Sequence, residues 1–220
     1  MKILCISDQI DPLIYTNSLK ERHADVDLVL AAGDLPLDYL EFIMSTLNKP
    51  LLFVFGNHHI GHYSYYRYGP SVYDVRADYE IHPCGASCAE SRVLNEEGLI
   101  IAGLGGCLRY NNGENQFSNF QMKMRILKLL PSLVFNRLFK GRFLDILLTH
   151  ASPLGIHDRA DLCHQGFRDF LWFMRVFKPR YLVHGHIHLY DYSEKRRTMY
   201  HDTLVVNAFS HCIIDTGDRN

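Results

Sequence analysis

Leu51-Leu52-Phe53-Val54-Phe55-Gly56-Asn57-His58-His59 is an apolar run that ends abruptly in a polar cluster. Four other apolar runs end in the same way, at Asp8, at Gly33-Asp34, at His150 and at His184-Gly185-His186-Ile187-His188. Strands of an open α/β sheet present ligand-binding groups just beyond their carboxyl ends. Five such ends can therefore meet in one crevice, although nearly two hundred residues separate the first from the last. We expect this crevice to hold a metal site.

Length and composition are those of a globular protein with one substantial core. The chain has 220 residues, of which 47% are apolar, and a net charge of -1, so we predict a single domain over residues 1–220. The first apolar run is too short for a secretory signal because Asp8 ends it, and no run approaches a membrane span. The six scattered cysteines are then expected to be reduced thiols, which predicts a cytoplasmic location.

Short β-prone runs alternate with longer segments, which is typical of βαβ units in a mainly parallel sheet. Two of the connecting segments carry apolar residues at helical spacing. Asp38 can cap the start of the first helix, and Pro179 ends the second. Eight strands are too many for one modest sheet covered by helices, so we predict two stacked sheets flanked by helices. The predicted strands cover residues 2–7, 27–32, 51–55, 99–103, 143–149, 181–184, 203–207 and 212–215.

The polar groups at the strand ends suit a particular class of ion. Carboxylate oxygen, amide oxygen and imidazole nitrogen together favour manganese, iron, zinc, nickel or cobalt, and thiolates are absent from the set. A lone aspartate at a strand end is weak support, because it often caps the next helix. Gly-Asp, Gly-Asn-His and Gly-His-Ile-His in this order are more specific, since each glycine lets the chain turn sharply close to an ion.

In this order the clusters resemble the motifs D-x-H, G-D, G-N-H-[D/E], a lone H and G-H-x-H of the calcineurin-like metallophosphoesterases. The resemblance extends from Asp8 to His188. It implies an α/β four-layer sandwich, in which two stacked mixed β-sheets lie between helices, with two divalent ions at one edge. Manganese is the ion we expect first. By resemblance, Asp34 would bridge the ions, one site would be completed by Asn57, His150 and His186, and the other would contain Asp8 and His188.

Two positions depart from the family pattern. Ile10 stands where the first motif has its histidine, so the site that contains Asp8 lacks one ligand and its occupancy is an open question. Asp11 can substitute as an oxygen ligand, directly or through water, or it can simply cap the turn before Pro12. His59 stands where the family usually has a carboxylate that orients the preceding histidine.

The resemblance implies hydrolysis of a phosphomonoester or phosphodiester by attack of a metal-bound hydroxide. His58 would then face the leaving group as a general acid, or as a donor to the developing charge. The alternative is a non-catalytic binding or scaffold module on the same fold, with a degenerate metal site marked by Ile10. Retention of the other metal ligands and of His58 favours the enzyme.

Other residues are candidates for substrate binding. Arg109 lies past a predicted strand end and can grip a phosphate or form a surface salt bridge, while His157 and His59 lie near the crevice edge. Six tyrosines between residues 61 and 79 can stack on a planar group or pack within their own loop. We therefore expect a small phosphate ester, with a nucleotide-like ester as one option. The choice between monoester and diester, and the oligomeric state, stay open.

A basic segment at about residues 115–142 has six Lys or Arg residues and no Asp or Glu. Its apolar residues predict an amphipathic helix that is broken near Pro131. Such a helix can lie on an anionic membrane, meet a polyanion, or pack on its own domain. The net charge of -1 does not favour nucleic acid as a partner.

Overall fold

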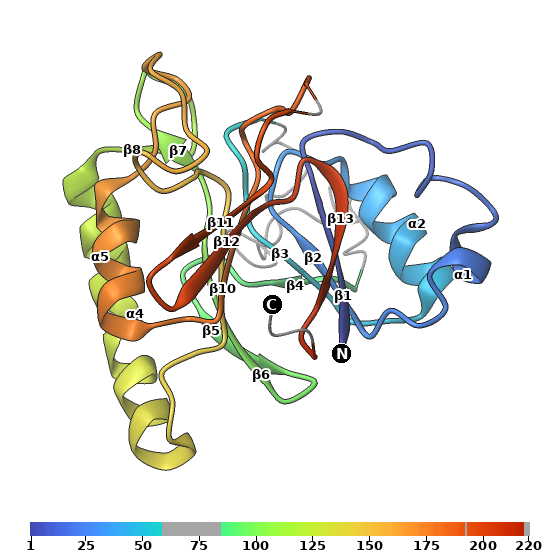
Figure 1. The fold of residues 1–220 in the computed structure, drawn as a ribbon, viewed down its shortest axis with the longest axis horizontal. Helices are drawn as coiled ribbons and strands as arrows, with labels where there is room; N and C mark the ends of the chain where they lie inside the picture. Colours follow the sequence, from blue (N-terminus) through green and yellow to red (C-terminus); the bar gives the residue numbers. More distant parts are fainter. Residues whose placement is uncertain (59–84, 192, 218–220) are drawn as a thin grey trace, which may run out of the picture.

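Two large sheets stack face to face between two layers of helices (Figure 1). The computed structural model describes residues 1–58, 85–191 and 193–217. Helices α4 and α5 cover one outer face at the left of the view, and α1 and α2 cover the other at the right. The predicted four-layer sandwich is therefore confirmed.

The first sheet carries the amino-terminal strands. Its order is β13-β1-β2-β3-β4, with β1, β2, β3 and β4 parallel and β13 antiparallel at the edge. Because the parallel strands point the same way, the polar residues that follow them lie at one edge of the sheet. The strands are β1 (Lys2–Ser7), β2 (Leu28–Ala31), β3 (Leu51–Phe53), β4 (Ser87–Cys88) and β13 (Ser210–Asp215).

The second sheet has the order β11-β12-β10-β9-β6-β5. Its four inner strands are parallel, and β5 and β11 pair antiparallel at the two edges. A separate pair, β7 (Cys107–Leu108) and β8 (Gln116–Phe117), leads into α4. The strands of the second sheet are β5 (Val93–Glu96), β6 (Leu99–Leu104), β9 (Ile146–Thr149), β10 (Tyr181–His184), β11 (Arg197–Tyr200) and β12 (Thr203–Asn207).

Side chains alternate between two cores along each central strand. In β1, Ile3 and Cys5 point into the core between the sheets, whereas Leu4 and Ile6 pack under α1 (Leu19–Arg22) and α2 (Leu37–Leu47). A third core lies under α4 (Asn119–Lys140) and α5 (Arg168–Phe177). Burial on both faces explains why these strands are continuous apolar runs in the sequence.

Two local predictions were wrong. Asp38 does not cap α2, because the helix begins after Pro36 and Asp38 lies in its first turn. The basic segment forms one helix that runs through Pro131 without a break, closed at its start by a capping box between Ser118 and Gln121. Among the helices in the described part of the chain, none combines the length and apolar character needed to cross a bilayer.

Candidate metal centre

The five polar clusters follow parallel strands of the two sheets. Asp8, Asp34 and Asn57 come after β1, β2 and β3, while His150 and His186 come after β9 and β10. Asp8, Asp34 and His186 adopt positive φ angles of 63°, 57° and 66°, in the left-handed region that non-glycine residues rarely occupy. Such a conformation costs on the order of 1 kcal/mol and is concentrated at functional sites. The positive φ angles at these three turns are therefore consistent with a functional role for the side chains of Asp8, Asp34 and His186.

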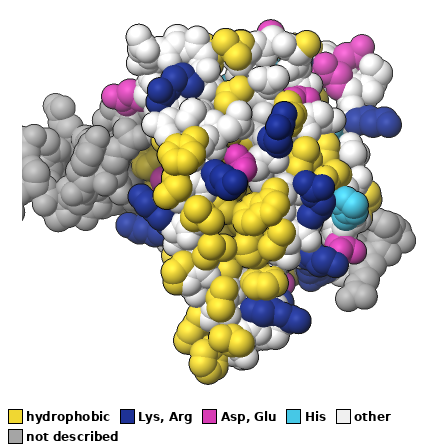
Figure 2. All heavy atoms as spheres, turned by 90° about the vertical axis from the view of Figure 1, so that its left-hand side faces the viewer, with side chains coloured by type: hydrophobic (Ala, Val, Ile, Leu, Met, Phe, Trp, Pro, Cys, Tyr) yellow, Lys and Arg dark blue, Asp and Glu magenta, His cyan; other side chains and the backbone are white. Residues whose placement is uncertain are grey.

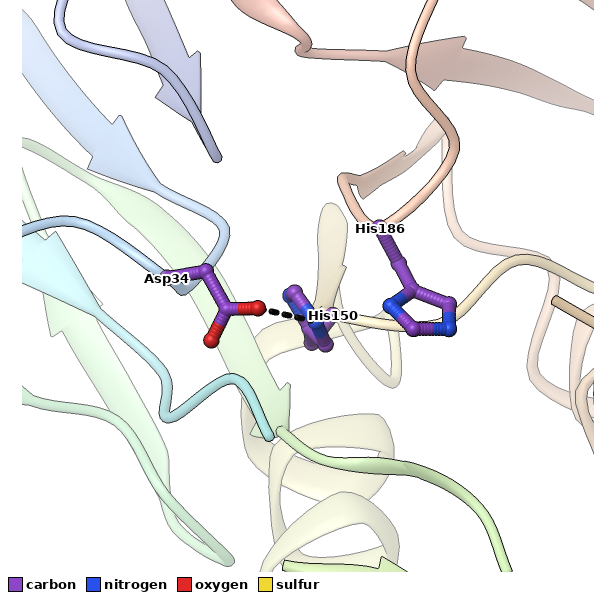
Figure 3. A group of neighbouring side chains, drawn as sticks. All are labelled: Asp34, His150 and His186. Atoms are coloured by element: carbon purple, nitrogen blue, oxygen red, sulfur yellow. Dashed lines mark ion pairs between the residues drawn. The ribbon is translucent and has the colours of Figure 1, made fainter. Parts of the chain in front are cut away.

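Asp34, His150 and His186 form the centre of this cluster, with His150 between the other two (Figure 3). Their ligand atoms all lie within 4.8 Å of one another. His150 Nε2 is 3.3 Å from Asp34 Oδ2 and 3.0 Å from Asn57 Oδ1. His150 is fully buried, and Asn57 and His186 are nearly so.

Backbone and side-chain hydrogen bonds fix which atom of each ligand faces the centre. His150 Nδ1 donates to the carbonyl oxygen of Ala32 at 2.8 Å, which directs Nε2 toward Asp34 and Asn57. Asn57 donates from Nδ2 to the Tyr110 hydroxyl at 3.2 Å, so its Oδ1 faces His150. Asp34 Oδ2 and Asn57 Oδ1 thus both face His150 Nε2, which donates to them when it is protonated and offers them a shared lone-pair position for an ion when it is not. This donor set fits a divalent ion, and an imidazole that donates its other N–H to a carbonyl is usual for a metal ligand.

The pKa shifts of Asp34 and His150 show that each residue stabilises the charged form of the other. Burial opposes the charged form of Asp34, but the facing His150 and its hydrogen bond outweigh burial and hold the pKa of Asp34 below its ordinary value. Burial would also lower the pKa of His150, yet Asp34 raises it to about 9. Burial raises the pKa of Asp8 and lowers the pKa of His186 to about 3. Asp34 and His150 are thus the electrostatic core of the cluster.

Glycine is required at three turns because ligand side chains occupy the space of a Cβ. A Cβ on Gly33 would lie 2.6 Å from His150 Nδ1, and one on Gly56 would lie 1.8 Å from Asp34 Oδ1. At Gly185 it would lie 2.4 Å from Asp8 Oδ2. Real Cβ atoms essentially never approach another heavy atom below 3.0 Å. The glycines of the motifs therefore let the turns and the ligand side chains pack directly on one another.

Residues 1–190 match the family model described as calcineurin-like phosphoesterase. The chain belongs to the calcineurin-like phosphoesterase family. Membership supports a metal-dependent phosphoesterase at the level of the family. No curated protein is similar enough to the chain to count as a match.

Solved structures confirm the fold of this family member. One of them aligns with a TM-score of 0.64 at 15% identity, covering 98% of this chain and 95% of its own. The protein TT1561 of Thermus thermophilus aligns with a TM-score of 0.61 at 14% identity, covering 95% of this chain and 89% of its own. At these identities the likeness concerns the fold alone.

Asp8 and His188, the residues predicted to hold a second ion, lie beside this cluster, and the His188 side chain is the more exposed of the two. His188 Nε2 lies 3.8 Å from Asp8 Oδ1, while its Nδ1 lies 2.8 Å from the Tyr190 hydroxyl. The His188 ring stacks on Phe209 with centroids 4.7 Å apart, which holds its orientation. Asp8 accepts the backbone N–H of His186 at both oxygens, at 3.0 and 2.9 Å, so the Asp8 side chain is bonded directly to the loop that carries His186.

Ile10 and Asp11 follow Asp8 but have different environments. The Ile10 side chain is 42% exposed and offers no donor atom. Asp11 is buried, and its Oδ1 accepts the backbone N–H of Leu13 at 2.8 Å. Its Oδ2 is bonded by the side chains of Ser210 and His211. A role for Asp11 as a metal ligand stays a prediction, and in this structure both of its carboxylate oxygens are directed toward protein donors.

The residues predicted to contact substrate lie in different settings. His58 is exposed, and its backbone N–H donates to Asp34 Oδ1 at 2.9 Å. Arg109 is exposed and donates to the side chain of Gln121 at 3.0 Å. His157 is partly buried, with its ring nitrogens 2.9 Å from His184 Nε2 and from Thr198 Oγ1. His59 lies outside the described residues, as do the six tyrosines of residues 61–79.

Several groups that support the site were not foreseen. Tyr110 and the Ala32 carbonyl orient ligands, and the Cys163 carbonyl accepts from His186 Nε2 at 2.6 Å. A sequence pattern cannot indicate which backbone carbonyl groups contact the site, because every residue has a backbone carbonyl group. Asp161, Cys163 and His164 also form a cluster with metal-ligand atoms, and the His164 ring lies 5.3 Å from that of His186.

Proposed function

We propose that this protein is a metal-dependent hydrolase of a small phosphomonoester or phosphodiester. The observation that carries the proposal is the close approach of the possible ligand atoms of Asp34, His150 and His186, all within 4.8 Å of one another, with Asn57 Oδ1 beside them. Their chemistry suits manganese, iron, zinc, nickel or cobalt, and manganese is the ion we propose first. We also propose a cytoplasmic location, in line with the five free cysteines of the described residues.

The chain supplies ligands from two groups of loops. Asp34, between the groups, would bridge two ions, with Asn57, His150 and His186 on one side and Asp8 and His188 on the other. When bound, two ions neutralise phosphoryl oxygens and activate water for in-line attack. The buried positions of Asn57, His150 and His186 keep these ligands fixed, so that little reorganisation is needed during the reaction.

His58 is placed to act on the leaving group. Its backbone N–H is bonded to Asp34 Oδ1, so its side chain starts directly beside the ligand that we place between the ions. From this exposed position it can donate a proton to the oxygen that leaves. We assign His58 to this step and no metal-binding role.

A cavity of about 340 Å³ is available beside the metal motif for part of the substrate. Ile187 and Leu189 line it, together with Arg159 and Lys195. Asp158 and Glu194 line it as well, and Arg159 pairs with Glu194 at 3.4 Å, so the lining carries charges of both signs. Its apolar residues suit the apolar part of a leaving group, and a nucleotide-like ester stays one option. His157 also lines the cavity, and since both its nitrogens have partners it would contact such a group through its ring. Arg109 stays a candidate phosphate ligand that would first have to leave Gln121.

One observation favours a second function. Ile10, which by the motif resemblance stands where a metal-binding histidine is expected, offers no donor atom and is 42% exposed, as expected if the fold serves as a non-catalytic binding or scaffold module. The complete set around Asp34 favours the enzyme. Both functions predict the same fold and differ in metal content and turnover.

Metal analysis combined with an assay on aryl phosphate monoesters and diesters tests the proposal. We expect bound metal and manganese-stimulated hydrolysis, both abolished by Asp34→Asn and retained by the exposed control Asp202→Asn. Ile10→His should raise the metal stoichiometry, whereas Ile10→Ala should not. Protein that binds no divalent ion and is inactive with each of them would support the scaffold instead.

A further inference from the structure

The outer surface of α4 exposes a row of large apolar side chains (Figure 2). Positions 120, 124, 127, 131, 134 and 138 follow one another at intervals of three and four residues, with the exposed Pro131 at the centre, and 135 and 139 lie beside them, which places the row on one face of the helix. Phe120, Leu138 and Phe139 are more than 70% exposed. The complete row is Phe120, Met124, Leu127, Val134, Phe135, Leu138 and Phe139, and we call it the outer apolar row.

The same helix buries a different row on its own domain. Met122, Ile126, Leu129 and Leu133 face the core beneath α4, and each is at most 2% exposed. Packing within the domain is therefore complete without the outer apolar row. A surface helix usually has one apolar face, and a large exposed apolar patch marks an interaction surface.

Basic side chains are exposed along α4, three of them (Lys123, Lys128 and Arg137) beside the outer apolar row and Lys140 on the last turn. No Asp or Glu occurs between Asn115 and Leu144. The other two cations of the segment are paired with acidic residues, Arg125 with Glu90 and Arg142 with Asp145. Because the whole chain has a net charge of -1, this concentration of positive charge is local to α4.

We propose that α4 binds the surface of an anionic lipid bilayer, lying along it with the outer apolar row at the boundary between headgroups and acyl chains. Aromatic and aliphatic side chains flanked by Lys and Arg suit that boundary, where burial and attraction to anionic lipid act together. The carboxyl-terminal part of α4 projects beyond the sheets, so it can enter the headgroup layer ahead of the rest of the molecule (Figure 1).

A second copy of the chain fits this face less well. Apposing two α4 helices would place Lys and Arg of both copies along one seam, with no acidic residue on the segment to neutralise them. A lipid surface supplies both the missing negative charge and the apolar layer. The inference does not rest on the proposed catalytic function, because it uses no residue of the metal centre.

Sedimentation of the full chain with vesicles tests the proposal. We expect binding to phosphatidylcholine vesicles that contain about one-third phosphatidylserine, with little binding to phosphatidylcholine alone and a decrease as salt is raised. Leu138→Ser/Phe139→Ser should weaken partitioning at least about tenfold through lost apolar burial. Lys128→Glu/Lys140→Glu should weaken it by at least the same factor, since each cation contributes about fivefold.

Matched controls use exposed side chains elsewhere on the molecule. Leu13→Ser/Met199→Ser and Lys20→Glu/Lys195→Glu change the same kinds of group away from α4 and should bind vesicles like the unmodified protein. Circular dichroism establishes that each variant is folded. Absence of binding, or equal loss in the controls, would overturn the proposal. A dimer in sedimentation velocity that Leu138→Ser/Phe139→Ser dissociates would assign the row to a second copy instead.

Discussion

Gly56→Ala should remove metal from the protein while leaving the fold intact. The added Cβ would lie 1.8 Å from Asp34 Oδ1 and 2.3 Å from Asp34 Cγ. Ordinary van der Waals contact begins at 3.4 Å, so the carboxylate must move by well over an ångström or the turn must shift. The φ angle of Gly56 is not in the left-handed region, so alanine adds no backbone strain of its own.

The size of the effect follows from the tolerance of metal coordination. Ligand distances in a metal site are defined to within about 0.2 Å, so a carboxylate displaced this far no longer coordinates. Disturbing groups that merely orient ligands already costs about 10–100-fold in metal affinity. For Asp34, which we place between the two ions, we expect at least about 100-fold weaker binding. The packing conflict itself should cost on the order of 1–3 kcal/mol of stability.

Gly98→Ala is the matched control. Gly98 has a φ of +78° and no atom within 4 Å of an added Cβ, so alanine there strains the backbone without touching the site. We expect it to lose about 1 kcal/mol of stability and to keep its metal. Metal content after dialysis, manganese-dependent turnover and urea unfolding should be measured for both variants. The reasoning is refuted if Gly56→Ala retains metal, or if Gly98→Ala loses it to the same extent.

Three further predictions concern the same centre. His58→Gln should lower turnover by about 10²–10⁴-fold with unchanged metal content, and loss of metal would contradict its role at the leaving group. Tyr110→Phe removes the hydroxyl that accepts from Asn57 Nδ2, so metal affinity measured by competition with a chelator should fall about 10–100-fold, and unchanged affinity would contradict this. In metal-free protein, Asp34 raises the pKa of His150 from 6.5 to about 9. The interaction of Asp34 with protonated His150 should therefore contribute fully to the free energy of unfolding below pH 6.5, and this contribution should be lost as pH rises to 9. Urea unfolding with a chelator present should show this decline, and Asp34→Asn should abolish it.

Central strands were the most predictable part of the fold. The bounds of β1, β10 and β12 coincide with the predicted runs at residues 2–7, 181–184 and 203–207. These strands are buried on both faces, so their apolar runs are continuous, and they end at the polar residues Ser7, His184 and Asn207. The limits of such strands can therefore be predicted from where an apolar run begins and ends in the sequence.

Edge strands were missed for the opposite reason. Val93–Glu96 and Arg197–Tyr200 mix polar and apolar residues, and each forms a strand only by pairing antiparallel with a neighbour, β6 or β12. A pattern within four residues cannot specify such a partner. Tertiary pairing, rather than local preference, creates these strands.

Pro131 shows how packing can outweigh a local signal. Proline inside a helix costs about 3 kcal/mol, which favoured a break at this position. Ile126 and Leu129 before it and Leu133 after it all pack on one core, so a break would expose a buried row on one side. Pro131 itself lies on the exposed surface of the helix. Burial of the row along the full helix therefore exceeds the penalty.

The site could be predicted as a set of donors but not as an arrangement. The order of Asp34, Asn57, His150 and His186 at strand ends indicated one edge, because parallel strands end together, and the structure brings these four residues together. The choice of ring nitrogen on His150 and on His186 depends on the carbonyl groups of Ala32 and Cys163. Only the folded backbone places those carbonyls.

The two proposed ion sites, one around His150 and one around Asp8, differ in how many protein ligands they offer and in how firmly those ligands are held. At the His150 site, Asn57, His150 and His186 each use one side-chain atom in a hydrogen bond to a neighbouring group, and this bond determines which of their other atoms faces the centre. Around Asp8, His188 is held by Tyr190 and Phe209, but Ile10 supplies nothing and Asp11 is engaged by Leu13, Ser210 and His211. An ion there would have Asp8, Asp34 and His188 as protein ligands and water in its remaining positions, which is the open coordination of catalytic rather than structural sites. With Ile10 in place of the expected histidine, we therefore predict that the affinity for the second ion is lowered more than the turnover of the fully loaded protein, so that added manganese should restore turnover.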